Sequence, residues 1–423
     1  MAGGRASVRD FVQYTSLAAA IDVLQAHVKV SPREELVPLG RSFGRVLSRD
    51  VFSKFDVPLR DSSHMDGYAV RASDLSGASA AAPVTLARVE GSALGELPRR
   101  RLKAGEAHSV LTGGFIPDGA DSVVQAERVQ ASKASVSFSV PVELGEYVYP
   151  RGRDVKKGEK VLAKGRVLRG PDLVLLGSLH LGEVTVFARP RVAVLPTGSE
   201  LSEKISDTEP GKVAETHTLL LSRLIEGAGG TPVQMPIARD DREEIEQSIR
   251  VALKAAEIVI TLAGTSVSEA DLTEEAINAA GKPGVLVHGM RVTRGRVMGF
   301  GAVGGKAVVI LPGPIQGAVN AFNLLVYPLI RSFLGLGFSA PPSFPARMGN
   351  DWEAAKRFRD FTKIVFVRLD ATGEHIAVEG SMGETENVSF LSQSDGYLVL
   401  GEETTSLSRG DLVRVYLPVG LCP

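Results

Sequence analysis

The sequence is poor in the residues on which thiol and zinc chemistry depend. Among its 423 residues there is one cysteine, Cys422, next to the C-terminus. A single cysteine excludes an intrachain disulfide and a thiolate metal cluster, and it fits a reducing compartment. The seven histidines are scattered without the spacing of metal ligands, which argues against a zinc site.

Membrane and nucleic-acid signals are absent as well. No uncharged apolar run reaches the roughly 18 residues that a membrane-spanning helix needs. The early apolar stretch "SLAAAIDVLQAHV" carries Asp22 within it, unlike the core of a signal peptide. The net charge is -1, which gives no support for bulk electrostatic binding of nucleic acid. We therefore predict a soluble, cytoplasmic protein that binds neither a membrane nor nucleic acid.

The order of apolar patterns predicts several domains, as the chain length also suggests. Residues 8–51 show a mostly helical pattern, whereas short alternating runs over residues 82–141 are typical of strands in a small β domain. Residues 189–336 alternate apolar strands with amphipathic helices, which predicts a mainly parallel sheet covered by helices on both faces. The Pro-rich "APPSFPARM" then leads into a C-terminal domain of short strands.

Three strands of the α/β segment end in loops rich in Gly, Pro and Ser. The loops are "PTGSE" (196–200), "AGTSVSEAD" (263–271) and "PGPIQG" (312–317). In a parallel sheet all three emerge at the carboxyl edge, where open α/β sheets bind ligands. One such loop is ordinary turn chemistry, but three together favour a phosphorylated ligand. The phosphate fingerprints GxxxxGK[ST] and GxGxxG are absent.

The acidic residues and the arginines near these loops could each have either a structural or a functional role. Asp271 could cap a helix or favour its positive end, or it could bind a metal ion or activate water, with Glu200 and Glu269 sharing that work. The basic cluster in "RVTRGR" (291–296) could be a solvated turn or an anion clamp. The residues alone leave these alternatives open.

Longer motifs carry a resemblance to a known family over nearly the whole chain. The stretch "DSSHMDGYAV" (61–70) is similar to D-N-S-x-M-D-G-Y-A-V, and "LTGGFIPDGADSVVQAE" (111–127) is similar to T-G-x-x-x-P-x-G-A-D-x-V-V. "AGTSVSEAD" resembles G-G-x-S-x-G-x-x-D, and "LPGPIQG" resembles L-P-G-N-P-x-S. These are motifs of the MoeA / gephyrin E-domain family of molybdenum cofactor biosynthesis.

The resemblance implies a multi-domain α/β plus β fold built around a central, mainly parallel α/β sandwich of the molybdopterin-binding type. It places an elongated helical/linker domain at residues 1–54 and 142–187, and an inserted β domain at 55–141. The α/β domain then covers residues 188–338, and a C-terminal β-barrel-like domain covers 339–423. An elongated homodimer with a cleft shared between subunits is also implied.

The implied activity is insertion of molybdate, or tungstate, into adenylylated molybdopterin with release of AMP and assistance from Mg²⁺. A molybdopterin adenylyltransferase could act as a partner. Asp271 takes the position of the family's catalytic aspartate and, with Glu200, would hold the metal. The implied substrate-binding residues are Thr197, Gly198, Ser199, Glu200, His217, Gly264, Ser266, Glu269, Arg294, Arg296, Pro312 and Gly313. The partner-subunit side of the cleft would comprise Asp61, Ser62, Asp66, Thr112 and Gly113, and Lys363 of the last domain would contact an anion.

Several departures from the family pattern fall in the ligand-facing loops. Ala263 and Ser268 replace glycines, and the K-P-G-K-P turn becomes residues 293–297, with arginines at 294 and 296. Others are Pro314 for Asn, Gly317 for Ser, Lys363 for Arg, and Glu215, Thr216 and His217 for D-S-N. Two hypotheses follow: an active transferase, or a non-catalytic paralogue that carries pterin or scaffolds a partner. A dinucleotide-dependent oxidoreductase lacks its glycine fingerprint.

Overall fold

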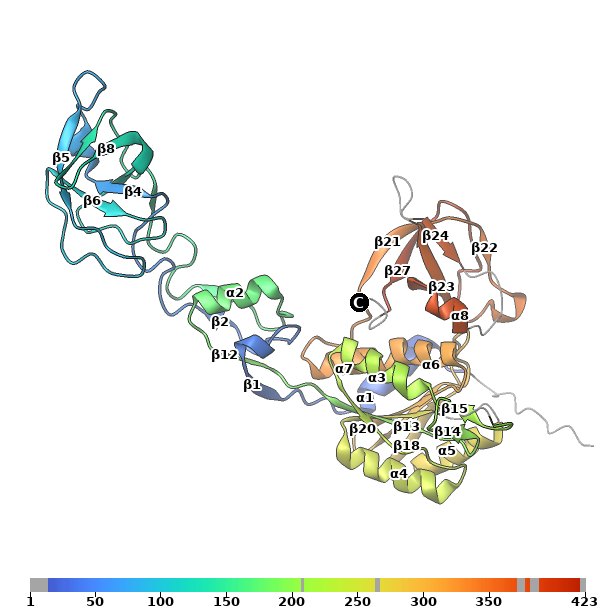
Figure 1. The fold of residues 1–423 in the computed structure, drawn as a ribbon. Coiled ribbons are helices and arrows are strands. Elements are labelled where there is room, and N and C mark those ends of the chain that lie inside the picture. Colours follow the sequence, from blue (N-terminus) through green and yellow to red (C-terminus); the bar gives the residue numbers. More distant parts are fainter. Residues whose placement is uncertain (1–13, 207–208, 263–266, 371–376, 381–387, 419–423) are drawn as a thin grey trace, which may run out of the picture. The chain divides into compact units, whose positions relative to one another are not determined.

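The computed structural model describes residues 14–206, 209–262, 267–370, 377–380 and 388–418, with the backbone alone at 267–271 and 377–380. The chain divides into two compact units (Figure 1). The first unit comprises residues up to Glu35 and from Val186 onward, and the second comprises Leu36–Thr185. Each unit has its own sheets and core.

A six-stranded mixed sheet forms the centre of the first unit. In spatial order its strands are β16 (Thr231–Gln234), β13 (Arg191–Pro196), β17 (Ile258–Leu262), β20 (Lys306–Leu311), β19 (Gly299–Val303) and β18 (Pro283–His288). The first four are parallel, whereas β19 and β18 add an antiparallel hairpin at one edge. The prediction of a mainly parallel sheet is confirmed, and β17 is buried throughout, as strands covered on both faces are.

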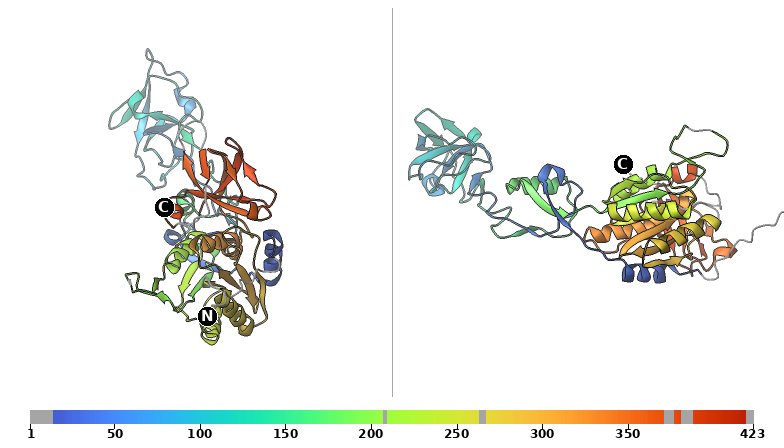
Figure 2. Two further views of the ribbon diagram at one scale, coloured as in Figure 1. Left: turned by 90° about the vertical axis from the view of Figure 1, so that its right-hand side faces the viewer. Right: turned by 90° about the horizontal axis from the view of Figure 1, so that it is seen from below.

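Helices cover both faces of this sheet (Figures 1 and 2). Helices α4 (Arg242–Ala255) and α5 (Val267–Ala280) lie on one face, where Ile245 and Ile249 pack against sheet residues. The other face carries α3 (His217–Ala228), α6 (Ile315–Ala321) and α7 (Tyr327–Phe333), and the π-helical segment η4 (Phe322–Val326) joins the last two. In the parts of the chain that the structure describes, none of the helices has the length and apolar character needed to cross a membrane.

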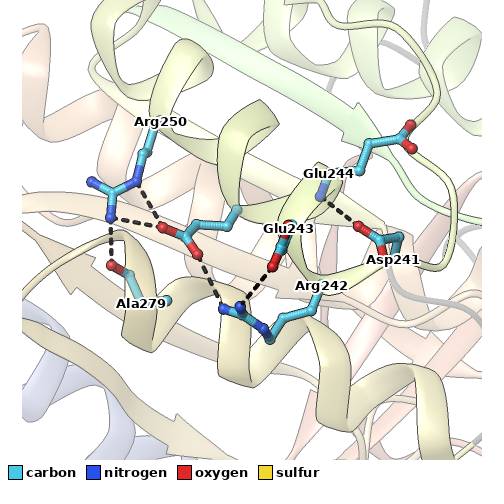
Figure 3. Close-up of polar contacts among 7 residues, drawn as sticks. Asp241, Arg242, Glu243, Glu244, Arg250 and Ala279 are labelled. Carbon is cyan, nitrogen blue, oxygen red and sulfur yellow. Dashed lines mark hydrogen bonds and ion pairs between the residues drawn. The ribbon is translucent and has the colours of Figure 1, made fainter.

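Charged side chains fasten α4 to α5 (Figure 3). The Asp241 carboxylate caps α4 by accepting a hydrogen bond of 2.9 Å from the backbone N–H of Glu244. The Glu246 carboxylate accepts from the guanidinium groups of Arg242 at 3.1 Å and Arg250 at 2.8 Å. Arg250 also donates to the Ala279 carbonyl, at 2.6 Å, in the last turn of α5. This network holds the helix that follows the second of the three sheet-edge loops.

The N-terminal part of the chain departs from the predicted helical pattern. Helix α1 (Leu17–His27) is capped by Ser16 and packs against β18 and β19, so it belongs to the first unit and not with the linker segment. Beyond His27 the helix prediction for residues 8–51 is wrong. The chain there forms β1 (Glu34–Pro38), the 3-10 turn η1 (Leu39–Arg41) and β2 (Val51–Phe52), because Pro32 and Pro38 interrupt any helix.

The last part of the first unit is a closed barrel. Its strands are β21 (Ser343–Met348), β24 (Ala377–Gly380), β23 (Lys363–Asp370), β25 (Gly396–Leu400) and β27 (Leu412–Tyr416). Val365, Val367, Leu398 and Val415 fill its core. The predicted C-terminal β-barrel-like domain is confirmed.

The second unit contains the small β domain and the segments that flank it in sequence. Its six-stranded sheet has the order β7 (Ser122–Gln125), β4 (Gly67–Val70), β6 (Glu106–Val110), β5 (Val84–Val89), β9 (Ser135–Phe138) and β8 (Val129–Ala131). Two short pairs join distant segments, β3 (Ser62–Ser63) with β10 (Val148–Tyr149) and β2 with β11 (Lys160–Leu162). Helix α2 (Gly170–Ser178) opens with Pro171 in its first turn. The strands predicted between residues 82 and 141 are confirmed.

Candidate active site

The three strands that lead into the glycine-containing loops end at one edge of the α/β sheet. Pro196 at the end of β13 lies opposite Leu262 at the end of β17, and Leu262 in turn lies opposite Leu311 at the end of β20. The strands therefore stop in register, and the chain leaves all three at the same level. The prediction that these loops share the carboxyl edge is confirmed.

The first loop is joined directly to the end of β17 by Thr197. This side chain is 4% exposed, and its hydroxyl donates a hydrogen bond of 2.6 Å to the Leu262 carbonyl. The Thr197 backbone N–H donates to the same oxygen at 3.2 Å. The Thr197 hydroxyl is thus used within the protein, where it joins the first loop to the end of β17, and a substrate contact of Thr197 stays a prediction.

The rest of the first loop presents a glycine and an acid. Ser199 and Asp240 exchange two hydrogen bonds, from the Ser199 N–H at 2.8 Å and to the Ser199 hydroxyl at 3.1 Å. The Glu200 carboxylate lies over Gly198, since a Cβ at Gly198 would be 2.8 Å from Oε2. With φ at +152°, Gly198 also has a backbone that side chains disfavour. Substrate contacts of Gly198, Ser199 and Glu200 stay predictions.

The third loop meets the start of α3. The His217 Nε2 atom lies 2.7 Å from the Gly313 carbonyl oxygen, although the two residues are 96 positions apart. A carbonyl oxygen can only accept, so Nε2 carries the proton and the imidazole donates. Pro312, just before Gly313, is buried. The structure thus brings together His217, Pro312 and Gly313, which the resemblance assigned to one substrate site.

The arginine-containing turn lies against this third loop. A Cβ added to Gly317 of α6 would be 2.9 Å from both the Arg294 carbonyl oxygen and Pro312 Cβ, so the three residues are in close contact. Arg294 has φ of +52°, in the left-handed region that favours glycine. Arg296 is exposed, and its guanidinium carbon lies 5.7 Å from the centre of the Phe358 ring. The turn is therefore part of the same edge.

The turn is also fastened to the C-terminal barrel. The backbone N–H of buried Thr293 donates to the Thr362 carbonyl at 2.9 Å, and the Ile364 N–H donates to the Thr293 hydroxyl at 2.9 Å. The Arg291 guanidinium lies 3.5 Å from the Glu402 carboxylate. The barrel therefore fixes the backbone on which the two predicted anion-binding arginines stand.

Lys363 does not contact an anion as predicted. Its side chain is 2% exposed, and Nζ donates to the carbonyl oxygens of Arg359 at 2.6 Å, Glu402 at 2.8 Å and Gly401 at 3.2 Å. An ammonium group has three N–H donors, and all three have partners here. Burial lowers the pKa of Lys363, against the opposing attraction of nearby carboxylates. The prediction of an anion contact is wrong because the donors are used within the barrel.

The second loop lies in part outside the residues that the structure describes. Gly264 and Ser266 are not described, and the side chains of Glu269 and Asp271 are not described either. Helix α5 begins at Val267, four residues before Asp271, so Asp271 is not its N-cap. This excludes the capping interpretation. The catalytic and metal-binding roles of Asp271 stay predictions.

The donors available for a metal ion are few. Among the residues whose side chains the structure describes, there is no group of three or more His, Cys, Asp or Glu side chains placed to hold one. Glu200 supplies one carboxylate at the sheet edge, and Asp271 follows the neighbouring strand. Mg²⁺ typically takes one or two protein carboxylates and completes its shell with waters and substrate phosphates. The described side chains form no all-protein cage, and binding of Mg²⁺ by Asp271 and Glu200 stays a prediction.

In the second unit, two predicted acids organise the loops around them. Asp66 Oδ1 accepts hydrogen bonds from the backbone N–H of Thr112 at 2.7 Å and from its hydroxyl at 2.8 Å. These bonds hold the pKa of Asp66 below its usual value. Asp61 Oδ1 accepts from the Arg151 N–H at 2.8 Å. The predicted Asp61, Asp66 and Thr112 are thus placed in one cluster of loops.

A cavity of about 370 Å³ opens beside this cluster. Its walls include the predicted Ser62, Thr112 and Gly113. The sequence interpretation missed the other lining residues, which are Val57, Pro58, Ser63, His64, Tyr149 and Asp154. The Tyr149 hydroxyl donates to the Asp154 carboxylate at 2.5 Å, and this bond raises the pKa of Tyr149. The His64 and Tyr149 ring centres lie 6.2 Å apart. Tyr149 and Asp154 gave no sequence signal beyond their place in a Gly/Arg-rich loop.

Family models match the chain in three consecutive pieces. The MoeA N-terminal region (domain I and II) matches residues 15–179, the probable molybdopterin binding domain matches 193–332, and the MoeA C-terminal region (domain IV) matches 345–417. The three matches follow one another in domain order and leave only short segments between them.

Relatives and solved structures match along nearly the whole length. The molybdopterin molybdenumtransferase of Haemophilus influenzae is 30% identical over 384 residues, covering 90% of this chain and 93% of that protein. Molybdopterin molybdenumtransferase 2 of Mycobacterium tuberculosis is 29% identical over 384 residues, covering 90% of this chain and 94% of that protein. A molybdopterin biosynthesis MoeA protein from Pyrococcus horikoshii has a TM-score of 0.83 at 31% identity, covering 96% of this chain and 99% of that one. With matched domains, relatives and fold, the chain belongs to the MoeA family of molybdenum cofactor biosynthesis proteins.

Proposed function

We propose that the protein inserts molybdate, or tungstate, into adenylylated molybdopterin with release of AMP. Relatives that match it over nearly their full lengths are named molybdopterin molybdenumtransferases, which supports a late step of molybdenum cofactor biosynthesis. An adenylylated substrate requires an adenylyltransferase in the preceding step, so an enzyme of that class is the expected supplier.

The observation that carries the proposal is the continuous edge of the α/β sheet. Thr197 joins the first loop to the end of β17, His217 joins α3 to Gly313, and Gly317 brings the Arg294 backbone against Pro312. The edge therefore combines close backbone approach, a helix start and two arginines. These are the features that suit a ligand carrying phosphate and an oxyanion.

The proposed roles follow from the chemistry of the side chains. Arg294 and Arg296 would bind the oxyanion, because guanidinium groups offer several N–H donors and keep their charge. Asp271 and Glu200 would hold Mg²⁺, which when bound neutralises charge on the phosphoanhydride that is cleaved. Asp271 would also orient the attacking oxygen. The loop from Gly264 to Glu269, with Ser266, would contact the pterin phosphate.

We further infer a homodimer in which the partner supplies the other wall of the cleft through Asp61, Ser62, Asp66, Thr112 and Gly113. Support comes from large apolar side chains exposed in the second unit: Leu36 at 61%, Phe43 at 66%, Phe52 at 53% and Val174 at 74%. Contiguous exposed apolar side chains mark association surfaces, and these four are the candidates for such a surface. Sedimentation of the wild type and of Phe43→Ser tests this: a wild-type monomer contradicts the dimer.

A single-turnover assay tests the proposed reaction. Protein in excess is mixed with adenylylated molybdopterin, Mg²⁺ and molybdate, and AMP release is followed. We expect molybdate-dependent release in the wild type and its loss in Asp271→Asn. The matched control is Glu243→Gln on α4, whose carboxylate pairs with Arg242 on the surface, and it should behave as the wild type. Release at the wild-type rate from Asp271→Asn contradicts the proposed role.

One observation favours a second candidate, a non-catalytic pterin carrier. Lys363, which replaces an arginine of the family pattern, has its three donors used within the barrel. An oxyanion site without that cation has less positive charge than the resemblance implied. The same assay separates the candidates, because a carrier retains adenylylated molybdopterin tightly and releases no AMP at any molybdate concentration.

A further inference from the structure

Asn320 lies in α6, facing the arginine turn. Its side chain is 1% exposed, and Nδ2 lies 3.4 Å from both the Thr293 carbonyl oxygen and the Arg294 carbonyl oxygen. Both acceptors belong to the turn that carries the predicted anion-binding arginines. The amide therefore bridges two consecutive carbonyl groups of one turn.

This turn has a conformation that needs support. Arg294 has φ of +52°, which a residue with a Cβ adopts only at a cost in energy, so the surrounding structure must hold it there. One support is the barrel, through the hydrogen bonds of Thr293 with Thr362 and Ile364. The second support is α6, which approaches closely because Gly317 has no side chain. Asn320 supplies the hydrogen bonds on that side.

The asparagine is costly for the helix itself. With Nδ2 directed at the two carbonyls, Oδ1 is buried and has no hydrogen-bond partner among the residues described. A buried unpaired oxygen destabilises, and the adjacent Val319 and Ala321 are fully buried apolar side chains that offer it no partner. Helix stability therefore gives no reason for Asn at this position, whereas the two turn carbonyls do.

We propose that Asn320 is a positioning residue for the oxyanion substrate. By holding the Thr293 and Arg294 carbonyl groups, it fixes the left-handed turn and thereby the direction of the Arg294 and Arg296 side chains. The ligand class is a tetrahedral oxyanion such as molybdate or tungstate. This inference rests on the proposed function for the reaction, but the binding of an oxyanion can be measured without it.

The test compares two substitutions one helical turn apart. Asn320→Leu keeps the four branched side-chain heavy atoms and removes both donors. Asn323→Leu makes the same change at a neighbouring buried asparagine whose Oδ1 also has no partner among the described residues. We expect Asn320→Leu to raise the molybdate KM about tenfold, with kcat at saturating molybdate within about twofold of the wild type. Asn323→Leu should leave both constants unchanged. Equal KM increases in the two variants overturn the inference, because they indicate helix packing alone.

A second measurement keeps this test separate from the proposed reaction. Tungstate should raise the Tm of the wild type and of Asn323→Leu, and raise that of Asn320→Leu much less at equal concentration. If the wild type releases no AMP but shows this pattern, the proposed reaction fails and the positioning role stands. If the wild type releases AMP while Asn320→Leu keeps the wild-type molybdate KM, the positioning role fails. No tungstate effect on the wild-type Tm together with no AMP release overturns both.

Gly317→Ala provides an independent variant should Asn320→Leu not fold. The added Cβ would be 2.9 Å from the Arg294 carbonyl oxygen, so α6 or the turn must move apart and weaken the Asn320 bonds. We expect the same direction of change, a higher molybdate KM and a smaller tungstate shift. A wild-type KM and shift in Gly317→Ala overturn the proposed coupling between α6 and the turn.

Discussion

Two cationic regions of the first unit, both predicted to bind anions, have opposite environments. Lys363 is 2% exposed and donates to three backbone carbonyls inside the barrel. Arg296 is exposed, and the contact of its guanidinium with the Phe358 ring uses no N–H donor for a hydrogen bond. Arg296 belongs to the same turn as Thr293. Lys363 lies in the barrel strand between Thr362 and Ile364, which bond to Thr293. Of these two predicted anion contacts, Arg296 therefore keeps accessible donors, whereas Lys363 does not.

The barrel and the α/β part of the first unit also have different roles. The barrel holds the arginine turn through the backbone of Thr362 and Ile364, and Lys363 between them fixes the loop at Gly401 and Glu402. The arginine turn then places the positive charges of Arg294 and Arg296 at the sheet edge. Changing the barrel cation should therefore alter stability first, and changing the turn cation should alter oxyanion affinity first.

The largest effect is expected from Lys363→Met. The carbonyl groups of Arg359, Gly401 and Glu402 lose their shared buried donor, which should lower the free energy of unfolding by about 3 kcal/mol. Denaturant unfolding measures this, with the exposed Lys356→Met as the control that should change little. In the folded protein the molybdate KM should stay near the wild-type value. A KM increase without loss of stability would return Lys363 to the anion site and break the comparison.

Lys363 also predicts a pH dependence with a definite sign. Burial lowers its pKa in the folded protein below the ordinary value of 10.5, so the unfolded chain binds more protons between those two values. The contribution of Lys363 to the free energy of unfolding therefore rises as pH increases through that window. Unfolding measured across alkaline pH should show this rise in the wild type and lose it in Lys363→Met. If stability depends on alkaline pH in the same way in both proteins, the lowered pKa is not that of Lys363.

The next effect is expected from Arg296→Gln. Loss of one charge-assisted contact to the oxyanion should raise the molybdate KM about 10- to 100-fold while the free energy of unfolding changes little. The control is Arg347→Gln in the barrel, whose guanidinium donates to the Gly410 carbonyl at 2.8 Å. If both variants raise the molybdate KM equally, the effect comes from the overall charge of the protein and not from a contact of Arg296 with the oxyanion.

The smallest effect is expected from Thr112→Val in the second unit. This change removes the hydroxyl that donates to Asp66 and keeps the stronger backbone N–H contribution. The lowered pKa of Asp66 stabilises the fold above the ordinary Asp pKa, and this contribution is lost as pH falls through the lowered value. In Thr112→Val the pKa of Asp66 should be lowered less, so the contribution should be smaller and its loss complete at a higher pH. Carboxyl NMR titration of the full chain checks this, and an unchanged Asp66 pKa contradicts the contact.

Much of the fold was predictable because it rests on local periodicity. The apolar runs that became β13, β17 and β20, and the amphipathic pattern of α4, predicted both the parallel sheet and its ligand-binding edge. The C-terminal end of the first helix was not predictable from this pattern. Beyond His27, Pro32 and Pro38 prevent a helix even though the apolar spacing continues. The apolar pattern predicted whether a segment is a helix or a strand, whereas the residue at which the element ends depended on single residues such as proline.

The site was less predictable because its residues act through distant partners. Lys363 depends on carbonyl groups 38 and 39 positions later in the chain, and no spacing rule connects them. Gly317 stood out in sequence as a missing serine, but its meaning comes from the Arg294 carbonyl across the turn. Asn320 had a weak signal, as a polar residue in the apolar helix "GAVNAFNLLV", and that signal was missed.

The position of a bound oxyanion tests this account most directly. Crystals grown with AMP and soaked in tungstate would show the tungsten atom by its anomalous scattering. We predict a peak whose oxygens lie within hydrogen-bond distance of the Arg294 or Arg296 guanidinium groups, at the sheet edge beside His217 and Gly313. A tungsten peak held by Lys363, or one found only in the cavity beside Tyr149 and Asp154, would contradict the account.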